Sequence, residues 1–171
     1  MNKIVKLTII AIVISVSISM LSTSLFSDGH NAPADTSKTV EKIGSLKGST
    51  TTKTLSVEGS LPKFEVSAQT SGTLAGVEVT SMATYWAEMQ ANGTLYGECP
   101  NAGVIMAQDG VATFRASGTG SFTADGGTTF KGVVYVQTTA PSLSSLNGAA
   151  LVYNWDVDAE GNATWELWEW K

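Results

Sequence analysis

A period-two alternation of side chains runs through much of the chain after residue 54 and limits its fold more than any other feature. In residues 79–89, one set of positions holds Val79, Ser81, Ala83, Tyr85, Ala87 and Met89, and the other holds Thr80, Met82, Thr84, Trp86 and Glu88. Successive side chains of a strand point to opposite faces of a sheet, so this run predicts a long strand with bulk on both faces. The alternation recurs at 151–158 and around Gly132.

Turn signals separate these runs. They are Ala91-Asn92-Gly93, Gln108-Asp109-Gly110, Ala124-Asp125-Gly126-Gly127 and Ala159-Glu160-Gly161-Asn162. Gly and Asn tolerate the positive φ that tight hairpin turns require. Because no amphipathic helix is evident after residue 54, the spacing is typical of long antiparallel hairpins rather than of β-α-β units.

The expected fold class is therefore all-β, with about eight strands over residues 54–171. Such a sheet forms either a sandwich or a barrel. Glycines inside the strand-like runs, at Gly97, Gly103, Gly118 and Gly120, are typical of barrel corners where a sheet bends sharply. Closure also removes strand edges, which the few charged residues would protect poorly. We therefore expect a small closed antiparallel barrel, with the Trp-rich segment 163–171 as its closing strand.

The first 27 residues form a candidate membrane-targeting helix. Lys3 and Lys6 precede an uncharged stretch from Leu7 to Phe26, long enough as a helix to cross a hydrocarbon core of about 30 Å. Three interpretations remain open: an uncleaved anchor, a cleaved signal peptide, and a buried helix of a soluble protein. The lysines predict that the short N-terminal side stays in the cytoplasm. The domain would then face the outside of the cytoplasmic membrane, or be secreted after cleavage.

Residues 28–53 are expected to form a flexible linker rich in Ser, Thr and Lys. Large apolar residues occur there only at Val40, Ile43 and Leu46, which leaves one short helical turn as the alternative. The single histidine, His30, has no second soft ligand nearby. We expect it to be solvated rather than a metal ligand or a general base.

The charge balance argues against nucleic acid as a partner. The net charge is −5, and acidic residues outnumber basic ones after residue 53, so the domain repels phosphate backbones. No motif predicts a nucleotide, a metal ion or another cofactor. The single cysteine, Cys99, has no histidine in the domain to activate it, so we expect a small buried or loop-end residue, with an intermolecular disulfide as the alternative.

Several short segments carry a resemblance to known proteins. They are Val77-Glu78-Val79-Thr80, Thr84-Tyr85-Trp86, Leu95-Tyr96-Gly97-Glu98, Gly103-Val104-Ile105-Met106, Asp109-Gly110, Gly118-Thr119-Gly120, Leu146-Asn147-Gly148 and Leu167-Trp168-Glu169-Trp170-Lys171. Over nearly all of residues 54–171, the chain resembles a group of small uncharacterised prokaryotic proteins. Their strand pattern is similar to that of the allene-oxide-cyclase and dirigent type of β-barrel. The resemblance implies a barrel and no particular activity.

Five residues are candidates for a ligand-binding site: Tyr85, Trp86, Glu98, Arg115 and Trp155. The aromatic side chains would line the mouth or the interior of the barrel, and a charged residue would fix the polar end of a ligand. An inward Arg115 would need a carboxylate partner. An outward, solvated Arg115 is the alternative.

Three functions remain open. The first is an exported or tethered barrel that binds a small apolar molecule. The second is a cyclase or isomerase that folds a reactive substrate into one conformer, for which no catalytic residue is assigned. The third is a structural cell-surface protein whose interior is filled by side chains such as Met82, Met89 and Met106. Asn92 and Asn162 also satisfy the N-glycosylation rule at expected turns. The oligomeric state is not predicted.

Overall fold

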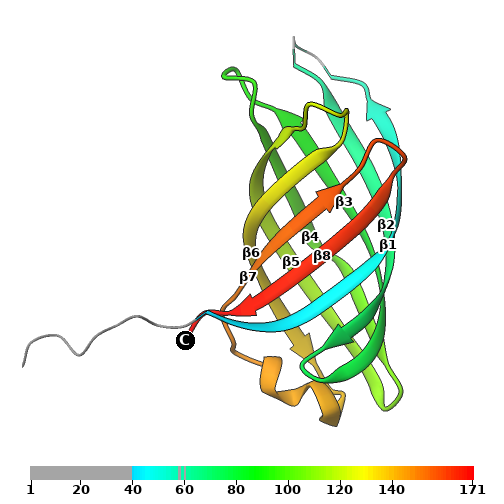
Figure 1. Ribbon diagram of the computed structural model, residues 1–171, viewed down its shortest axis with the longest axis vertical. Helices are drawn as coiled ribbons and strands as arrows, with labels where there is room; N and C mark the ends of the chain where they lie inside the picture. Colours follow the sequence, from blue (N-terminus) through cyan, green and yellow to red (C-terminus); the bar gives the residue numbers. More distant parts are fainter. Residues whose placement is uncertain (1–39, 58, 60) are drawn as a thin grey trace, which may run out of the picture. The chain divides into compact units, whose positions relative to one another are not determined.

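Eight antiparallel strands close into one barrel in the computed structural model of the chain, which describes residues 40–57, 59 and 61–171 (Figure 1). The strands are β1 (Glu41–Leu55), β2 (Lys63–Leu74), β3 (Val77–Met89), β4 (Leu95–Ala107), β5 (Gly110–Phe122), β6 (Thr128–Thr138), β7 (Leu151–Val157) and β8 (Asn162–Glu169). Each strand pairs with the next one along the chain, and β8 pairs with β1. The expected all-β fold class and the closed antiparallel barrel are confirmed.

The barrel begins earlier than the sequence predicted. The expected flexible linker reached residue 53, but β1 already begins at Glu41, so that expectation is wrong for residues 41–53. Both edges of β1 are paired, with Gly44–Leu55 opposite β2 and Glu41–Ser49 opposite β8. Backbone pairing on two sides, with only a few buried side chains, makes this polar segment a strand.

The more N-terminal predictions lie outside the described residues. They are the membrane-targeting segment at 1–27, the first part of the linker, and the solvated His30 within it. Within residues 40–171, positions 58 and 60 excepted, no helix is long and apolar enough to span a membrane.

Left-handed turn residues lie where the sequence predicted hairpins. Gly93, Gly126 and Gly161 have φ values of 83°, 90° and 86°, in the region that glycine adopts most readily. A further hairpin, between β2 and β3, uses Ala75 and Gly76 with φ values of 50° and 80°. That turn was not predicted, because Ala75 carries no turn signal.

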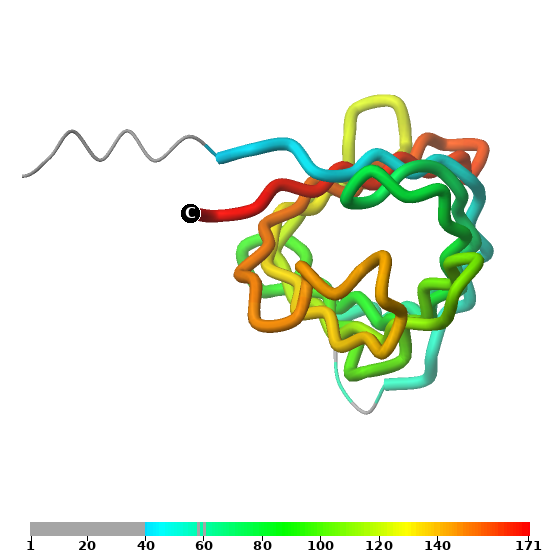
Figure 2. Tube along the Cα trace, turned by 90° about the horizontal axis from the view of Figure 1, so that it is seen from below, coloured from blue at the N-terminus to red at the C-terminus, as the bar shows by residue number. Residues whose placement is uncertain are grey.

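Figure 1 shows the connection between β6 and β7 at the lower end of the barrel. The core of the barrel is largely aliphatic, and its fully buried members include Leu46, Leu74, Ile105, Leu151 and Leu167. The 3₁₀ helix η1 (Pro141–Leu146), between β6 and β7, adds the buried Leu143 and Leu146 to this core. Figure 2, seen from below, shows η1 at this end.

A polar contact holds η1 to the β4–β5 turn. The carboxylate of Asp109 accepts hydrogen bonds from the backbone N–H and the hydroxyl of Ser142, at 2.8 and 2.7 Å. These hydrogen bonds lower the pKa of Asp109. Together with the buried leucines of η1, they hold this segment against the barrel.

The strand-interior glycines allow close approaches inside the barrel. A Cβ atom at Gly103 would collide with the ring of Phe114, and one at Gly118 would lie 2.6 Å from the hydroxyl of Tyr153. Between Cys99 and Gly103 the β4 register shifts against both neighbours, and Asn101 adopts a φ of 57°. The segment 99–102 is therefore a bulge in β4.

β8 is the closing strand that the sequence predicted. Trp165 and Leu167 are buried inside, whereas Trp168 faces outward, 5.9 Å from the ammonium of Lys42. The register of β1 against β8 shifts between Lys42 and Gly44, opposite Trp168 and Leu167. Trp170 is 61% exposed.

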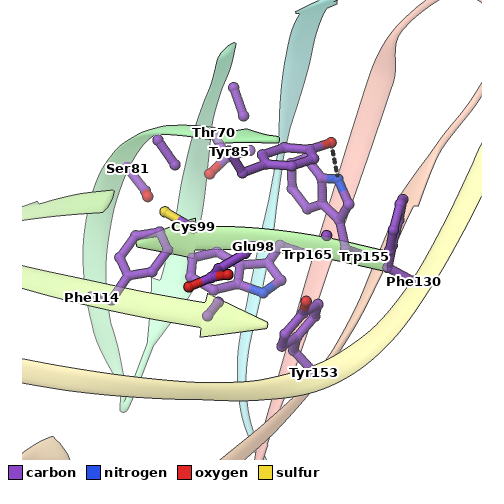
Figure 3. A pocket seen from close by; sticks show the side chains of 14 residues that line it. Thr70, Ser81, Tyr85, Glu98, Cys99, Phe114, Phe130, Tyr153, Trp155 and Trp165 are labelled. Atoms are coloured by element: carbon purple, nitrogen blue, oxygen red, sulfur yellow. Dashed lines mark hydrogen bonds between the residues drawn. The ribbon is translucent and has the colours of Figure 1, made fainter. Parts of the chain in front are cut away.

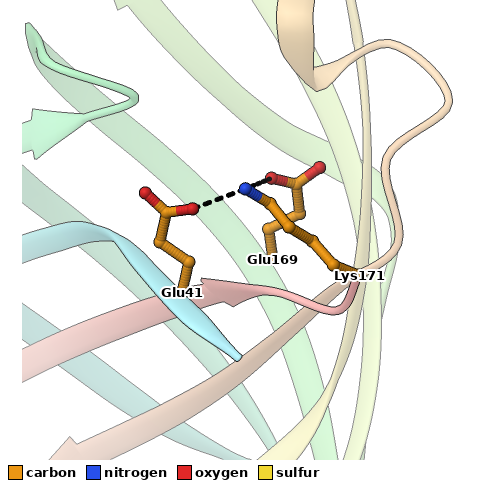
Figure 4. A network of polar contacts seen from close by, with 3 residues as sticks. All are labelled: Glu41, Glu169 and Lys171. Atoms are coloured by element: carbon orange, nitrogen blue, oxygen red, sulfur yellow. Dashed lines mark hydrogen bonds and ion pairs between the residues drawn. The ribbon is translucent and has the colours of Figure 1, made fainter. Parts of the chain in front are cut away.

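An ion-pair network joins the two ends of the described chain. Lys171 donates to Glu41 and lies 3.7 Å from Glu169 (Figure 4). The pKa of Glu41 is lowered by its hydrogen bond to Lys171, and the pKa of Lys171 is raised by the same contact. These side chains are exposed, so solvent screens the network and its contribution to stability is small.

Candidate functional site

A cavity lies inside the barrel, and Figure 3 shows the side chains that line it. Its aromatic lining consists of Tyr85, Phe114, Phe130, Tyr153, Trp155 and Trp165. Small residues of β2, β3 and β5, namely Ala68, Ala83 and Ala116, leave the space that these rings surround. The volume of this cavity is about 60 Å³, which is more than a single water molecule requires.

A wider hollow of about 350 Å³ forms the mouth of the barrel at its upper end. It is lined by the ends of the strands and by the loops around Gly126 and Gly161. Tyr85 and Phe130 line both the mouth and the inner cavity. The two spaces therefore adjoin at these rings.

Tyr85 and Trp155 form a hydrogen-bonded aromatic pair. The indole N–H of Trp155 donates to the hydroxyl oxygen of Tyr85 at 2.9 Å, and the rings stand edge-to-face with centroids 6.2 Å apart. Burial raises the pKa of Tyr85 to about 12, although the hydrogen bond from Trp155 partly opposes this shift. Tyr85 is therefore neutral at physiological pH, and its O–H can still donate to a second partner.

The other polar groups of the cavity are also uncharged. Burial raises the pKa of Tyr153 and that of the Cys99 thiol, so both keep their protons. Thr70 and Ser81 add two buried hydroxyl side chains. Cys99 is a free, buried thiol, as expected, and its raised pKa does not favour nucleophilic chemistry.

Two of the five predicted site residues come together in the cavity, namely Tyr85 and Trp155. Glu98 borders the same space from β4, but its ladder partners Trp86 and Ser117 belong to the outer face of the sheet. Residues directly opposite in a ladder point to the same face, so the carboxylate of Glu98 is an outer-face group.

Trp86 and Arg115 do not belong to the cavity. Trp86 lies on the outer face, with the ammonium of Lys63 at 4.1 Å from its ring and Tyr96 packed edge-on at 5.4 Å. Arg115 is exposed because its neighbour Phe114 points inward, and its guanidinium lies 5.9 Å from the ring of Tyr135. The outward alternative is therefore the correct one for Arg115.

Four aromatic residues of the lining were not singled out from the sequence: Phe114, Phe130, Tyr153 and Trp165. The alternation carried part of the signal, since Tyr153 shares a face with Trp155 and Trp165 shares one with Leu167. The sequence pattern did not identify which face of each run points into the barrel. Among residues 40–57, 59 and 61–171, no group of three or more His, Cys, Asp or Glu side chains is placed to hold a metal ion.

Comparisons with known proteins identify the fold and no family. No family model and no curated protein matches the chain. A solved structure, that of a conserved protein of unknown function from Rhodopseudomonas palustris, is similar with a TM-score of 0.63 and 9% sequence identity. The match covers 76% of this chain and 95% of the other. At this identity the likeness is one of fold alone, a barrel shared with an uncharacterised protein.

Proposed function

We propose that the barrel binds a small, largely apolar molecule in its central cavity. The observation that carries the proposal is a cavity inside the barrel, lined by aromatic rings and adjoining a wide mouth. Ligand sites in proteins are typically concave and mostly apolar, with a few polar groups that fix orientation. The hydroxyls of Tyr85 and Tyr153 would supply such groups.

A catalytic role on the same barrel is the second candidate, and we propose it on the resemblance to allene-oxide-cyclase and dirigent barrels alone. Catalysis of that type also begins with binding an apolar molecule in one conformer. The neutral tyrosines and thiol supply no strong base near pH 7. Simple binding therefore has more support than turnover.

Filling the cavity tests the proposal. In Ala83→Leu, the larger side chain would occupy the space that a ligand needs, so ligand uptake should be lost while the fold persists. Thr84→Leu is the matched control, because Thr84 is the next residue on β3 and is exposed. Native mass spectrometry and tryptophan fluorescence with a panel of neutral lipids would measure uptake.

The stability of Ala83→Leu distinguishes a cavity from a filled interior. Inserting such a side chain into a packed core costs about 1–3 kcal/mol, whereas an available cavity accepts it with little loss. A variant that is strongly destabilised, together with a wild-type protein that takes up no lipid from the panel, would contradict the proposal. That outcome would favour the structural role.

A further inference from the structure

The two tyrosine hydroxyls of the cavity differ in their hydrogen bonding. The oxygen of Tyr85 accepts the indole N–H of Trp155. In the part of the chain that the structure describes, Tyr153 lines the cavity and no side-chain hydrogen bond involves its hydroxyl. A partly buried hydroxyl without a protein partner gains from a partner supplied by a ligand or by water.

Gly118 fixes where the Tyr153 hydroxyl lies. A Cβ atom at Gly118 would stand 2.6 Å from that oxygen and 2.6 Å from the carbonyl oxygen of Lys131, so only glycine leaves room for this position. The Tyr153 hydroxyl therefore lies beside the backbone of β5, in space that this glycine leaves free.

Among the described residues that line the cavity, Glu98 is the only Asp, Glu, Lys, Arg or His, and its carboxylate belongs to the outer face. Burial keeps Tyr85, Tyr153 and Cys99 protonated. Moving a charged group into such a space without a partner costs several kcal/mol.

Resting on the proposed function, we infer that the cavity selects neutral molecules in which an apolar chain or ring carries one acceptor oxygen, and that Tyr153 donates to this oxygen. Ketone, ester and alcohol oxygens fit this description. Carboxylates and ammonium groups do not, because they would bring an uncompensated charge against the aromatic lining. Tyr153 is thus a specificity-determining residue of the site.

Matched probes with one chain length test this inference. The probes are decane, decan-2-one, methyl decanoate, sodium decanoate and decylammonium chloride. At neutral pH the ketone and the ester should bind, and the two ions should bind at least tenfold more weakly than the ester. Tryptophan fluorescence titrations would give the affinities, and native mass spectrometry would confirm one bound molecule.

Tyr153→Phe isolates the hydrogen bond. Removing one neutral hydrogen bond should weaken ketone binding about threefold to tenfold and leave decane binding almost unchanged. Comparing the two probes in both proteins cancels the difference in their hydration. Tyr135→Phe is the matched control, since Tyr135 is 49% exposed on the outer face. It should change neither affinity.

The outcomes separate the inference from the function on which it rests. If decane and the ketone bind but Tyr153→Phe weakens both equally or neither, the inference is overturned and the proposed function stands. The inference would also be overturned if the wild-type protein bound decanoate as tightly as methyl decanoate. If none of the probes binds, both the inference and the proposed function fail.

Discussion

At Gly103 the barrel interior leaves no room for a methyl group. A Cβ atom there would overlap the ring of Phe114, which itself packs on Trp165 with centroids 5.0 Å apart. Gly103→Ala should therefore lower the free energy of unfolding by about 1–3 kcal/mol, as overpacked cores do. Denaturant unfolding followed by circular dichroism would measure the loss.

A second-site change shows whether the collision is the cause. Phe114→Leu destabilises by itself because it removes a ring, but combined with Gly103→Ala it should cost less than the sum of the two single changes. Thr113→Ala, at the neighbouring position on the outer face, is the control for β5. Strict additivity in the double variant would show that Gly103 and Phe114 do not collide.

A site residue could be predicted from the sequence only where the inward face of its strand was evident. Tyr85 and Trp86 lie on opposite faces of one alternating run, and Arg115 also lies within a strand-like run, so the pattern alone gave both inward and outward candidates. An outer-face tryptophan is stable here because Lys63 lies over its ring. The alternation of β3 places bulk on both faces, so the sequence could not identify the inward one.

β1 is the element that turns an open sheet into a barrel. It pairs with β2 on one side and with β8 on the other, and it buries Leu46 completely. A fragment of residues 40–171 should therefore fold cooperatively, whereas 54–171 should expose the edges of β2 and β8 and aggregate. Size-exclusion chromatography and thermal unfolding of the two fragments would test this.

A control fragment distinguishes the effect of barrel closure on stability from the effect of shortening the chain. Residues 47–171 lack Leu46 but keep the pairing of Gly48–Leu55 with β2, so this fragment should be soluble but less stable than 40–171. If 54–171 instead melts cooperatively at the same temperature as 40–171, β1 is dispensable and barrel closure does not stabilise the domain.

The hairpin strands were predictable and β1 was not, for one physical reason. Strands β3 and β7 show apolar residues on the inward face, whereas the second half of β1 is a polar run from Thr50 to Thr54. Such a run is a strand only because pairing with β2 satisfies its backbone. Long-range pairing of this kind leaves no local signal in the sequence.

For the whole molecule, closure could be predicted but the cavity could not. Strand number, turn positions and interior glycines point to a barrel, and an eight-stranded barrel is just wide enough for its own side chains to fill. Whether space remains depends on where large and small residues of different strands meet. Here Ala68 and Ala83 are paired across β2 and β3, and together with Ala116 they line the cavity beside the aromatic rings.

Burial of neutral tyrosines inside the barrel makes the stability of the whole domain sensitive to alkaline pH. Burial raises the pKa of Tyr85 from 10.0 to about 12 and shifts that of Tyr153 in the same direction. Between these values the unfolded chain loses the tyrosine proton while the folded barrel keeps it. The contribution of these tyrosines to the free energy of unfolding is therefore fully present below pH 10 and is lost as the pH rises towards 12.

Thermal unfolding across this alkaline range, in wild type and in Tyr85→Phe, tests the effect. The variant loses the acceptor of Trp155, so its melting temperature should be lower at every pH, but its decline above pH 10 should be shallower. Tyr153→Phe should also flatten the decline, while Tyr135→Phe removes only an exposed hydroxyl and serves as the control. If both interior variants decline as steeply as wild type, the tyrosines inside the barrel do not hold their protons through burial, and the alkaline loss of stability comes from other groups.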